Sequence, residues 1–400
     1  MHDLVVVGGG PAGTSCARAA ALGGLDVLLI EKDVFPRDKL CAGALTQRVT
    51  GLLDFNIDPV VERRFSGGRV YSSSGDCLEL RRNKYAGCLV KRAMFDSFLL
   101  DKARDAGVEV TEGSKAVGVE QTRSAVRVLT LGDSYKAQLL VGADGVNGIV
   151  AKQVGVHTRW KSESVALCIA ADISVDEDEI NRCMSFSDAD DSIGLDLHFG
   201  VVERGYGWCI PKKDELNIGI GCRMDKAANL RDRWKAFVKR VEKQKGLSLN
   251  HPSYTAFRVP FGPPKNAYVA RRTMIVGDAA GLVSPVSGEG IFYAIKSGQL
   301  AASVACEAAE MKKPYHVMTY GASLSKTLLK ELSAAQFFAE MLHKSIRNAD
   351  LVIQIAQEDP IMREYFIDIM AGTRPLEKVK RDIMKRMAIS HPLNALKLRF

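Results

Sequence analysis

The chain opens with a short apolar strand that runs directly into three consecutive glycines. Residues 5–13 read Val-Val-Val-Gly-Gly-Gly-Pro-Ala-Gly, and a second apolar run over 25–30 ends at Glu31. Such glycines allow a tight turn with room for a pyrophosphate, and the following helix points its positive end at that charge. Glu31 lies about 20 residues on, where a carboxylate accepts hydrogen bonds from ribose hydroxyls. The segment therefore predicts a dinucleotide-binding unit with an unphosphorylated adenosine ribose. Its motif residues are Gly8, Gly10, Ala12 and Gly13.

Length and cysteine usage set the broad class. The 400 residues permit one large domain or two to three modest ones. Nine cysteines are an odd number without a Cys-x-x-Cys pair, and Met1 leads straight into the nucleotide strand without a signal peptide. We therefore expect a cytoplasmic protein whose thiols are mostly small buried hydrophobes. No stretch approaches the roughly 18 apolar residues of a membrane span, and we expect no metal site.

The formal charge of +8 is concentrated near the carboxyl terminus, where residues 373–400 carry eight Lys and Arg against two acidic residues. Apolar residues recur at helical spacing beside those cations. This basic amphipathic helix either contacts an anionic membrane surface peripherally or packs on the body of the protein with a solvated basic face. Nucleic-acid binding is disfavoured, because only one aromatic residue accompanies the charges. The apolar stripe is Leu376, Val379, Ile383 and Met387.

Changes of pattern along the chain predict an α/β nucleotide-binding domain that is split in sequence. Its first part covers 1–160, and a return segment over 261–312 contains a further buried strand and a long helix from about 288 to 310. Between them, 161–260 shows longer alternating strands typical of an antiparallel-sheet domain. Residues 313–400 are predicted to be helical, which makes the chain α+β overall. The alternating strands are expected at 165–175, 193–202, 205–210 and 217–222.

Two aspartates follow buried strands, Asp144 within 141–145 and Asp278 within 276–281. Either one alone is explained as a turn residue. Together with the glycine motif, they make the chain resemble the flavoprotein hydroxylase-like superfamily. The FAD domain of that superfamily combines a Gly-x-Gly-x-x-Gly turn, an Asp-Gly motif and a Gly-Asp motif. The resemblance spans roughly residues 3–310 and implies FAD as the cofactor.

The resemblance also implies roles for individual residues. Asp278 would bind the ribityl chain, and the helix that begins at 288–291 would present its amides to the pyrimidine edge of the flavin, stabilising the anionic reduced form. Arg92 would reach the FAD phosphate or ribityl region; a surface ion pair with Asp96 is the alternative. The main chain of Val117 would contact adenine. The other implied cofactor-binding residues are Lys32, Lys39, Cys41, Ala42, Ala44, Asp144, Gly277, Gly288, Gly290 and Ile291.

Within this superfamily, three features resemble the geranylgeranyl reductase branch. Gly281 stands where hydroxylases commonly have His. Residues 36–44, Pro-Arg-Asp-Lys-Leu-Cys-Ala-Gly-Ala, are similar to its Lys-x-Cys-x-Gly signature, and 206–211, Tyr-Gly-Trp-Cys-Ile-Pro, to its Tyr-x-Trp-x-Phe-Pro substrate motif. Residues 287–295 are very like the start of its flavin helix. Departures leave the identity of the isoprenoid open. They are Glu203 for a Pro, Ile210 for a Phe and Ala42 for a Gly.

The motif at residues 206–211 fits a binding cavity for a lipid chain. On a strand, Tyr206, Trp208 and Ile210 point to one face and, with Pro211, would wall an apolar cavity; the alternative is that this face is the domain core. Each buried methylene contributes about 0.8 kcal/mol, so a long isoprenoid binds by packing alone. The hypothesis is that hydride from reduced FAD adds to an isolated C=C bond of a geranylgeranyl or polyprenyl chain. Tyr206 and Trp208 would stabilise carbocation-like charge. Cys41 either positions groups or passes a proton, or is a packing thiol.

Other functions stay open at this point. Gly219-Ile-Gly221 lies in a strand pattern and no second nucleotide fingerprint appears, so NADPH or NADH binding transiently, or ferredoxin, would supply electrons. An FAD-dependent monooxygenase shares the expected fold. A halogenase-like enzyme normally shows Trp-x-Trp-x-Ile-Pro, which 206–211 matches only in part. A prenyl-binding carrier without FAD is disfavoured by the intact glycines.

Overall fold

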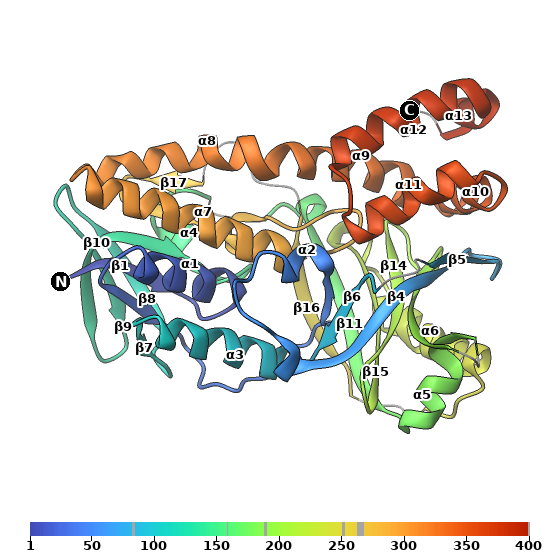
Figure 1. Ribbon diagram of the computed structural model, residues 1–400, viewed down its shortest axis with the longest axis horizontal. Helices are drawn as coiled ribbons and strands as arrows, with labels where there is room; N and C mark the ends of the chain where they lie inside the picture. Colours follow the sequence, from blue (N-terminus) through green and yellow to red (C-terminus); the bar gives the residue numbers. More distant parts are fainter. Residues whose placement is uncertain (82–84, 158, 188–189, 250–252, 262–267, 399–400) are drawn as a thin grey trace. The chain divides into compact units, whose positions relative to one another are not determined.

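The computed structural model describes residues 1–400 except 82–84, 158, 188–189, 250–252, 262–267 and 399–400 (Figure 1). The chain divides into two compact units. In contrast to the predicted segmentation, residues 40–91 and 333–400 belong to the same unit as residues 165–258. The first unit comprises Met1–Lys39, Arg92–Ser164 and Val259–Leu332, and the second comprises Leu40–Lys91, Val165–Arg258 and Ser333–Phe400.

A mixed sheet with the strand order β17-β18-β10-β1-β2-β7 forms the centre of the first unit. β1 (His2–Val7) pairs in parallel with β2 (Val27–Ile30) and β10 (Ser134–Gly142), and β10 pairs in parallel with β18 (Thr273–Ile275). Their carboxyl ends therefore meet at one edge, where open α/β sheets bind ligands. The remaining strands are β7 (Glu109–Thr111), β8 (Ala116–Gln121), β9 (Val126–Thr130) and β17 (Val269–Ala270).

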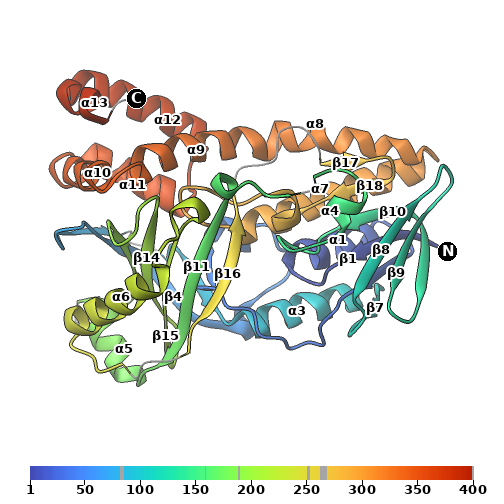
Figure 2. The ribbon, with the colours of Figure 1, turned by 180° about the vertical axis from the view of Figure 1, so that it is seen from behind.

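Two helices of this unit, α1 (Pro11–Leu22) and α7 (Ile291–Glu310), pack side by side (Figures 1 and 2). Gly298 permits the contact, because a Cβ there would lie 2.3 Å from the carbonyl oxygen of Ala12. Ser297 Oγ accepts a hydrogen bond from the Gly277 amide at 3.0 Å. These contacts fasten α7 to the amino end of α1 and to the turn after β18. The unit also contains α3 (Arg92–Asp105), α4 (Val150–Gln153) and α8 (Tyr320–Leu324).

A larger sheet with the order β16-β11-β15-β14-β13-β4-β6-β3 organises the second unit. β11 (Val165–Ser174), β15 (Glu215–Arg223), β14 (Gly205–Pro211) and β13 (Asp190–Phe199) pair antiparallel. The predicted strand over 193–202 ends earlier, at Phe199, because Gly200 takes a φ of +76°. The other strands are β3 (Ala44–Thr46), β4 (Val61–Tyr71), β5 (Cys77–Arg81), β6 (Gly87–Val90), β12 (Ser185–Ser187) and β16 (Thr255–Pro260).

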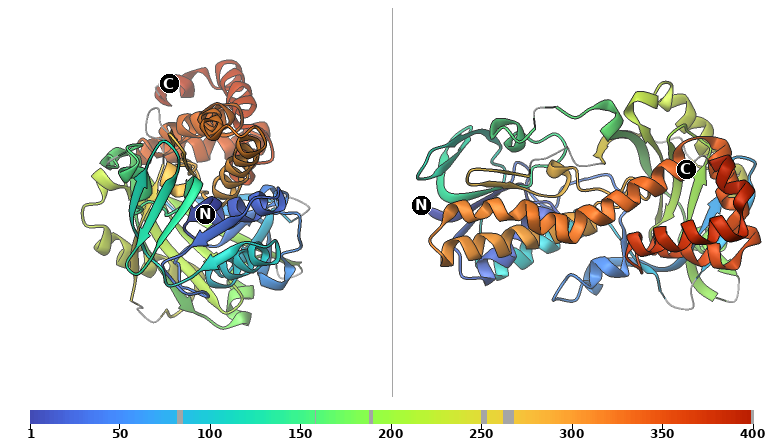
Figure 3. Two further views of the ribbon diagram at one scale, coloured as in Figure 1. Left: turned by 90° about the vertical axis from the view of Figure 1, so that its left-hand side faces the viewer. Right: turned by 90° about the horizontal axis from the view of Figure 1, so that it is seen from above.

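Helices cover this sheet. α6 (Leu230–Lys245) and α5 (Glu177–Met184) lie together on one face of β14 and β15 (Figure 2). On the other face, His343 at the end of α9 (Lys330–His343) stacks on Tyr206. The carboxyl-terminal helices gather in one group (Figure 3). They are α10 (Ile346–Glu358), α11 (Pro360–Ala371), α12 (Leu376–Ser390) and α13 (Pro392–Leu398), and α2 (Gln47–Thr50) completes the unit.

The apolar stripe predicted for the basic carboxyl-terminal helix is buried. Its four side chains are between 0% and 3% exposed, so α12 packs on protein through this stripe. Nowhere in the described part of the chain is a helix both long and apolar enough to cross a membrane.

The α6 face of the second sheet holds a buried histidine. His198 is fully buried, stacks on Tyr71 with 4.5 Å between ring centroids, and meets the edge of Phe237 at 5.0 Å. Among the described residues, neither of its ring nitrogens has a hydrogen-bond partner. Burial, with smaller contributions from the charges of Arg240 and Lys245, lowers the pKa of His198 to about 3.

We expect His198 to make the fold acid-sensitive. Its ordinary pKa is about 6.5, so between roughly pH 3 and 6.5 the unfolded chain binds a proton that the folded chain does not. Stability therefore rises with pH across this window, and at about pH 5 the penalty is about 2 kcal/mol. His198→Phe keeps the ring contacts and removes the titration. Its denaturant midpoint should change less between about pH 5 and pH 7.5 than that of the unaltered protein; equal changes would contradict this role.

Candidate active site

The turn between β1 and α1 is closely packed on one side and open on the other. An ideal Cβ on Gly8 would lie 2.3 Å from the Ala143 carbonyl oxygen, and one on Gly13 only 1.8 Å from the Gly8 carbonyl oxygen. At Gly10 the nearest atom is Nη2 of Arg37, 3.8 Å away. The first turn of α1 has neither a side-chain cap nor an acidic residue. The loop therefore leaves room for an anion beside the positive end of a helix.

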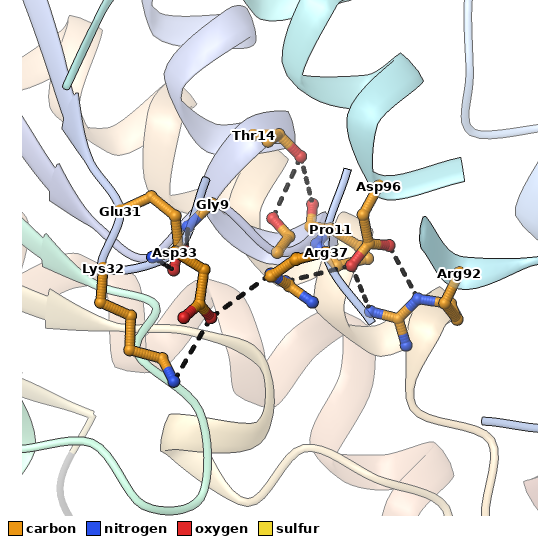
Figure 4. Close-up of polar contacts among 10 residues, drawn as sticks. Gly9, Pro11, Thr14, Glu31, Lys32, Asp33, Arg37, Arg92 and Asp96 are labelled. Carbon is orange, nitrogen blue, oxygen red and sulfur yellow. Dashed lines mark hydrogen bonds and ion pairs between the residues drawn. The ribbon is translucent and has the colours of Figure 1, made fainter. Parts of the chain in front are cut away.

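Glu31 lies at the end of β2, beneath the glycine loop (Figure 4). Only 4% of it is exposed. Its Oε2 accepts a hydrogen bond from the Gly9 amide at 2.5 Å and its Oε1 accepts one from the Asp33 amide at 3.0 Å. Each carboxylate oxygen can accept a further bond, so these contacts are compatible with the predicted ribose role. Lys32 is exposed and pairs with Asp33 at 3.4 Å.

A buried carboxylate joins two arginines beside this loop (Figure 4). Asp96 is fully buried and accepts two hydrogen bonds of 2.7 Å from the Nε and Nη2 atoms of Arg92. Arg37 Nη2 donates to the same carboxylate at 3.2 Å, and its guanidinium lies over the Phe35 ring. Arg92 is thus a buried partner of Asp96 rather than a surface cation. Arg37 is the guanidinium nearest the open side of Gly10, and the sequence interpretation missed it although it stands in the 36–44 motif.

Asp144 follows β10, and its two carboxylate oxygens differ in their hydrogen bonding. Its Oδ2 accepts hydrogen bonds from the amides of Ile149 and Val150, at 2.6 and 2.9 Å. Within the described residues, its buried Oδ1 has no partner. Burial raises the pKa of Asp144, although the two amides act in the opposite direction. A buried acceptor without a partner is a place where a bound hydroxyl or water can donate.

Asp278 and the amino end of α7 lie together. An ideal Cβ on Gly277 would lie 2.9 Å from the Ala12 Cβ, and one on Gly290 would lie 3.5 Å from Asp278 Oδ1. α7 begins at Ile291 with Gly290 as its N-cap, without a side-chain cap or a first-turn acid. The helix start predicted at 288–291 is therefore confirmed. Gly288, with a φ of +71°, forms the preceding turn.

Val117 lies on β8, where the side chain of Gln153 binds the backbone. Gln153 Nε2 donates to the Val117 carbonyl at 3.2 Å, and its Oε1 accepts from the Val119 amide at 2.6 Å. Next to this contact is an open pocket of about 310 Å³. It is lined by Val119, Gln121, Gln153, Val154 and Arg271.

In the second unit, residues of β14 alternate between two distinct environments. Gly207 and Cys209 face α6: an ideal Cβ on Gly207 would meet Phe237 at 2.8 Å, and Cys209 belongs to the α6 core. Tyr206 and Trp208 lie on the opposite face, with 6.0 Å between their ring centroids. They share a face, as strand alternation predicts, and that face is not the α6 core.

Tyr206 and Trp208 together form an aromatic wall, and two further rings extend it. Phe199 lies 5.9 Å from Tyr206, and His343 stacks on Tyr206 at 5.8 Å with planes 18° apart. Ile210 and Pro211 are buried at the end of the same strand. The sequence interpretation had no signal for His343, because α9 follows β14 by more than a hundred residues.

Trp208 rests on the backbone of the neighbouring strand β15. An ideal Cβ on Gly219 would lie 2.3 Å from Trp208 Cζ2, and one on Gly221 would lie 3.5 Å from Cζ3 of the same ring. The two glycines of β15 therefore leave the space that the indole occupies, which we call the Trp208 seat. On the same strand, Asn217 is fully buried; its Oδ1 accepts from Trp208 Nε1 at 2.6 Å, and its Nδ2 donates to Asp172 at 2.7 Å.

We expect Asn217→Ala to release the Trp208 ring. The change leaves a buried indole N–H without its acceptor, which lowers the free energy of unfolding by about 1–3 kcal/mol. Tryptophan emission should shift to longer wavelength as the ring gains contact with water. The chain has three tryptophans, so the spectrum of Trp208→Phe identifies the contribution of Trp208. An unchanged Trp208 emission would show that Asn217 does not hold the ring.

Cys41 lies near Tyr206. The thiol accepts a hydrogen bond from the Gly43 amide at 3.4 Å. Burial, and secondarily the charges that Cys168 and Cys41 would carry, raise the pKa of Tyr206 well above its ordinary value. Burial also raises the pKa of Cys168 to about 12, with smaller contributions from Cys222 and Cys41. Cys41 and Cys168 thus lie close enough to Tyr206 for their charges to act on its pKa. Of the other predicted residues nearby, Lys39 is exposed, and Ala42 and Ala44 are partly buried.

Comparison with known proteins identifies the family. A family model described as FAD binding domain matches residues 1–323. The chain is 31% identical over 324 residues to digeranylgeranylglycerophospholipid reductase 1 of Methanothermobacter thermautotrophicus, covering 76% of this chain and 77% of that protein. The chain belongs to the geranylgeranyl reductase family of FAD-binding proteins.

Other members and neighbours agree with this placement. The chain is 27% identical over 420 residues to the chloroplastic geranylgeranyl diphosphate reductase of Nicotiana tabacum, covering 99% of this chain and 83% of that protein. A geranylgeranyl bacteriochlorophyll reductase-like structure from Thermoplasma acidophilum has a TM-score of 0.82 at 23% identity, with 99% and 98% of the chains covered. A flavin-dependent brominase has a TM-score of 0.73 at 18% identity, with 97% and 99% covered. The predicted fold class is confirmed.

The residues of this geranylgeranyl reductase family member fit FAD. Open space beside Gly10 and the uncapped amino end of α1 suit a pyrophosphate. The unpartnered Oδ1 of Asp144 lies at the same sheet edge. Asp278 and the uncapped start of α7 suit a polyhydroxyl chain and an electron-rich ring edge. Three independent elements of one unit thus offer the donors and acceptors that such a cofactor requires.

Proposed function

We propose that this protein is an FAD-dependent oxidoreductase that reduces isolated C=C bonds of a geranylgeranyl or polyprenyl chain. The observation that carries the proposal is the aromatic wall of Tyr206 and Trp208, which stands on a glycine strand and on the face opposite the α6 core. It occurs in a chain whose first unit fits FAD. The relatives named as reductases of geranylgeranyl lipids and diphosphates support the same substrate class.

Most of the residues that would hold the cofactor belong to the first unit. The loop amides near Gly10 and the guanidinium of Arg37 would bind the pyrophosphate, with Arg92 orienting Arg37 through Asp96. Glu31 would bind the adenosine ribose, Asp278 the ribityl chain, and the α7 amides the flavin ring. Further contacts are proposed at Gly8, Ala12, Gly13, Lys32, Lys39, Cys41, Ala42, Ala44, Val117, Asp144, Gly277, Gly288, Gly290 and Ile291.

The substrate would lie against the aromatic wall of Tyr206 and Trp208. Reduced FAD, when bound, would supply a hydride, and one proton would complete the addition across the C=C bond, so that the alkene gains two electrons and two hydrogens. The faces of Tyr206 and Trp208 would stabilise positive charge that develops on the tertiary carbon. Burial keeps the phenol of Tyr206 protonated, and the Cys41 thiol would hold the proton for the neighbouring carbon. Ile210 and Pro211 extend the apolar surface along the chain.

The role of Cys41 is tested by two substitutions. If its Sγ holds the proton, Cys41→Ala should lower turnover by about 100-fold, the usual range for a positioned acid, while Cys41→Ser retains part of it. FAD content and substrate affinity should change little. Turnover that is unimpaired in both variants would remove Cys41 from the reaction and leave it as a packing thiol.

We further infer that electrons arrive transiently, from NADPH or NADH bound at the flavin or from a small carrier such as ferredoxin. The Gly219–Gly221 segment is a strand that seats Trp208, so it is not a second nucleotide loop. Flavin reduction by each donor, followed under anaerobic conditions, distinguishes these sources.

The proposal as a whole is tested by product analysis. The FAD-loaded protein, chemically reduced with dithionite, is mixed with geranylgeranyl phospholipid, geranylgeranyl diphosphate or a prenylated hydroquinone. We expect products heavier by two hydrogens for each bond reduced. A monooxygenase or halogenase would instead consume oxygen rapidly with NAD(P)H in response to an aromatic or apolar substrate. Substrate-stimulated oxygen uptake with an oxygenated or halogenated product would overturn the reductase proposal.

A further inference from the structure

The outward side of the last two helices exposes large aliphatic side chains. Ile389 is 80% exposed, Leu393 72% and Leu396 75%, whereas such residues are usually buried. Leu393 and Leu396 are three residues apart and so share one side of α13, and Ile389 lies in the last turn of α12 before the corner. Leu398 is only 3% exposed. α13 therefore packs on the protein through one side and leaves apolar side chains on the other.

Cations border these aliphatic residues. Lys378, Arg381 and Lys385 are exposed on α12 at spacings of i, i+3 and i+7, and Lys397 directly follows Leu396. The acid Asp382 lies among them: it accepts a hydrogen bond from Arg374 Nη2 at 2.6 Å, and its Oδ1 lies 3.7 Å from Arg381 Nε. Aliphatic side chains bordered by an excess of positive charge complement a bilayer with anionic head groups, where the chains insert and the cations stay at the phosphates.

The corner that carries these residues is fixed rather than loose. Asp359, the N-cap of α11, accepts a hydrogen bond from Arg386 Nε at 2.8 Å and lies 2.9 Å from His391 Nε2. Burial alone would raise the pKa of Asp359, but the bonds from Arg386 and His391 hold it well below its ordinary value. The carboxylate therefore stays ionised, and the backbone that carries the apolar side chains is already ordered before binding.

We propose that this surface docks the protein on an anionic lipid bilayer. The docking surface consists of Met384, Ile389, Leu393 and Leu396 with Lys378, Arg381, Lys385 and Lys397. It is distinct from the buried stripe of α12, which faces protein. The inference goes beyond the proposed reaction and does not depend on it, because exposure and charge alone carry it.

Vesicle binding of the FAD-loaded full chain tests the proposal without any prenyl substrate. We expect binding to phosphatidylcholine vesicles that contain phosphatidylglycerol, weaker binding to phosphatidylcholine alone, and weakening with salt. The double change Leu393→Ser with Leu396→Ser should weaken binding by about tenfold or more. Lys378→Gln with Lys385→Gln should mainly remove the preference for anionic lipid. Leu131→Ser alters a side chain that is 86% exposed in the first unit, and it should bind like the unaltered protein.

Three results would overturn the proposal. The first is the absence of binding to anionic vesicles at low salt, and the second is equal binding by the double leucine variant. The third is a dimer in solution that the leucine changes dissociate while vesicles stay unbound, which would make this surface a contact between two copies. Thermal unfolding checks that each variant is folded. Failure of vesicle binding leaves prenyl reduction of dispersed substrate unaffected, so the two proposals fail separately.

Discussion

Replacing Gly13 with alanine is expected to lower FAD affinity by about 10- to 100-fold. The added Cβ would lie 1.8 Å from the Gly8 carbonyl oxygen, so the first turn of α1 and the glycine loop must separate by more than an ångström. Overpacking of this kind costs about 1–3 kcal/mol, and it moves the amides that bind the pyrophosphate. Each 1.4 kcal/mol lost in binding is about tenfold in affinity. Titration of the apoprotein with FAD, followed by flavin fluorescence, measures the effect.

Two other glycines serve as controls for this prediction. Nothing lies within 4 Å of an ideal Cβ on Gly132, so Gly132→Ala should bind FAD normally. At Gly10 the nearest protein atom is 3.8 Å away. Gly10→Ala should therefore leave the apoprotein as stable as before and weaken only the binding of FAD. If Gly13→Ala binds FAD like the unaltered protein, the loop is not the pyrophosphate site.

Gly219→Ala is expected to lower prenyl reduction strongly while FAD stays bound. Its Cβ would lie 2.3 Å from Trp208 Cζ2 and 2.6 Å from the Ala170 Cβ, so the indole must leave its seat. Because Trp208 is held by Asn217 and is 7% exposed, it has no nearby alternative position. We expect turnover to fall by about 100-fold or more, since an ångström of misplacement costs that much.

A second substitution separates the Trp208 seat from general damage. Trp208→Phe shortens the ring and should remove its collision with the new Cβ, while the contact with the Ala170 Cβ remains in both variants. Gly219→Ala combined with Trp208→Phe should therefore be more active than Gly219→Ala alone. Such coupling between neighbours is measured by a double-mutant cycle. Additive losses, or loss of FAD from Gly219→Ala, would show that the strand does not act through the indole.

Local pattern was enough to predict much of the first unit. The glycine loop, Glu31 and the start of α7 depend on residues close together in sequence, and the structure has them where the spacing predicts. The pairing of Arg37 with Asp96 joins positions 59 residues apart. No periodicity links such positions, so the guanidinium nearest Gly10 emerged only from the fold.

The second unit shows the same limit more strongly. Strand alternation placed Tyr206 and Trp208 on one face, but it could not say which face packs on α6. That answer depends on the register of β14 with β15, which sets Gly219 opposite Trp208. Residues 40–91 were expected in the nucleotide-binding part, yet β4 pairs in parallel with β13. Parallel pairing across more than a hundred residues leaves no local signal.

A single turnover without oxygen tests the central claim most directly. The protein is loaded with FAD, reduced to the stoichiometric point, freed of excess reductant, and mixed anaerobically with a geranylgeranyl lipid. The account predicts that the flavin is reoxidised by the alkene alone and that the lipid gains two hydrogens for each flavin oxidised, with Gly219→Ala remaining reduced. A flavin that stays reduced with every prenyl substrate, yet reacts with oxygen to give an oxygenated or halogenated product, would contradict it.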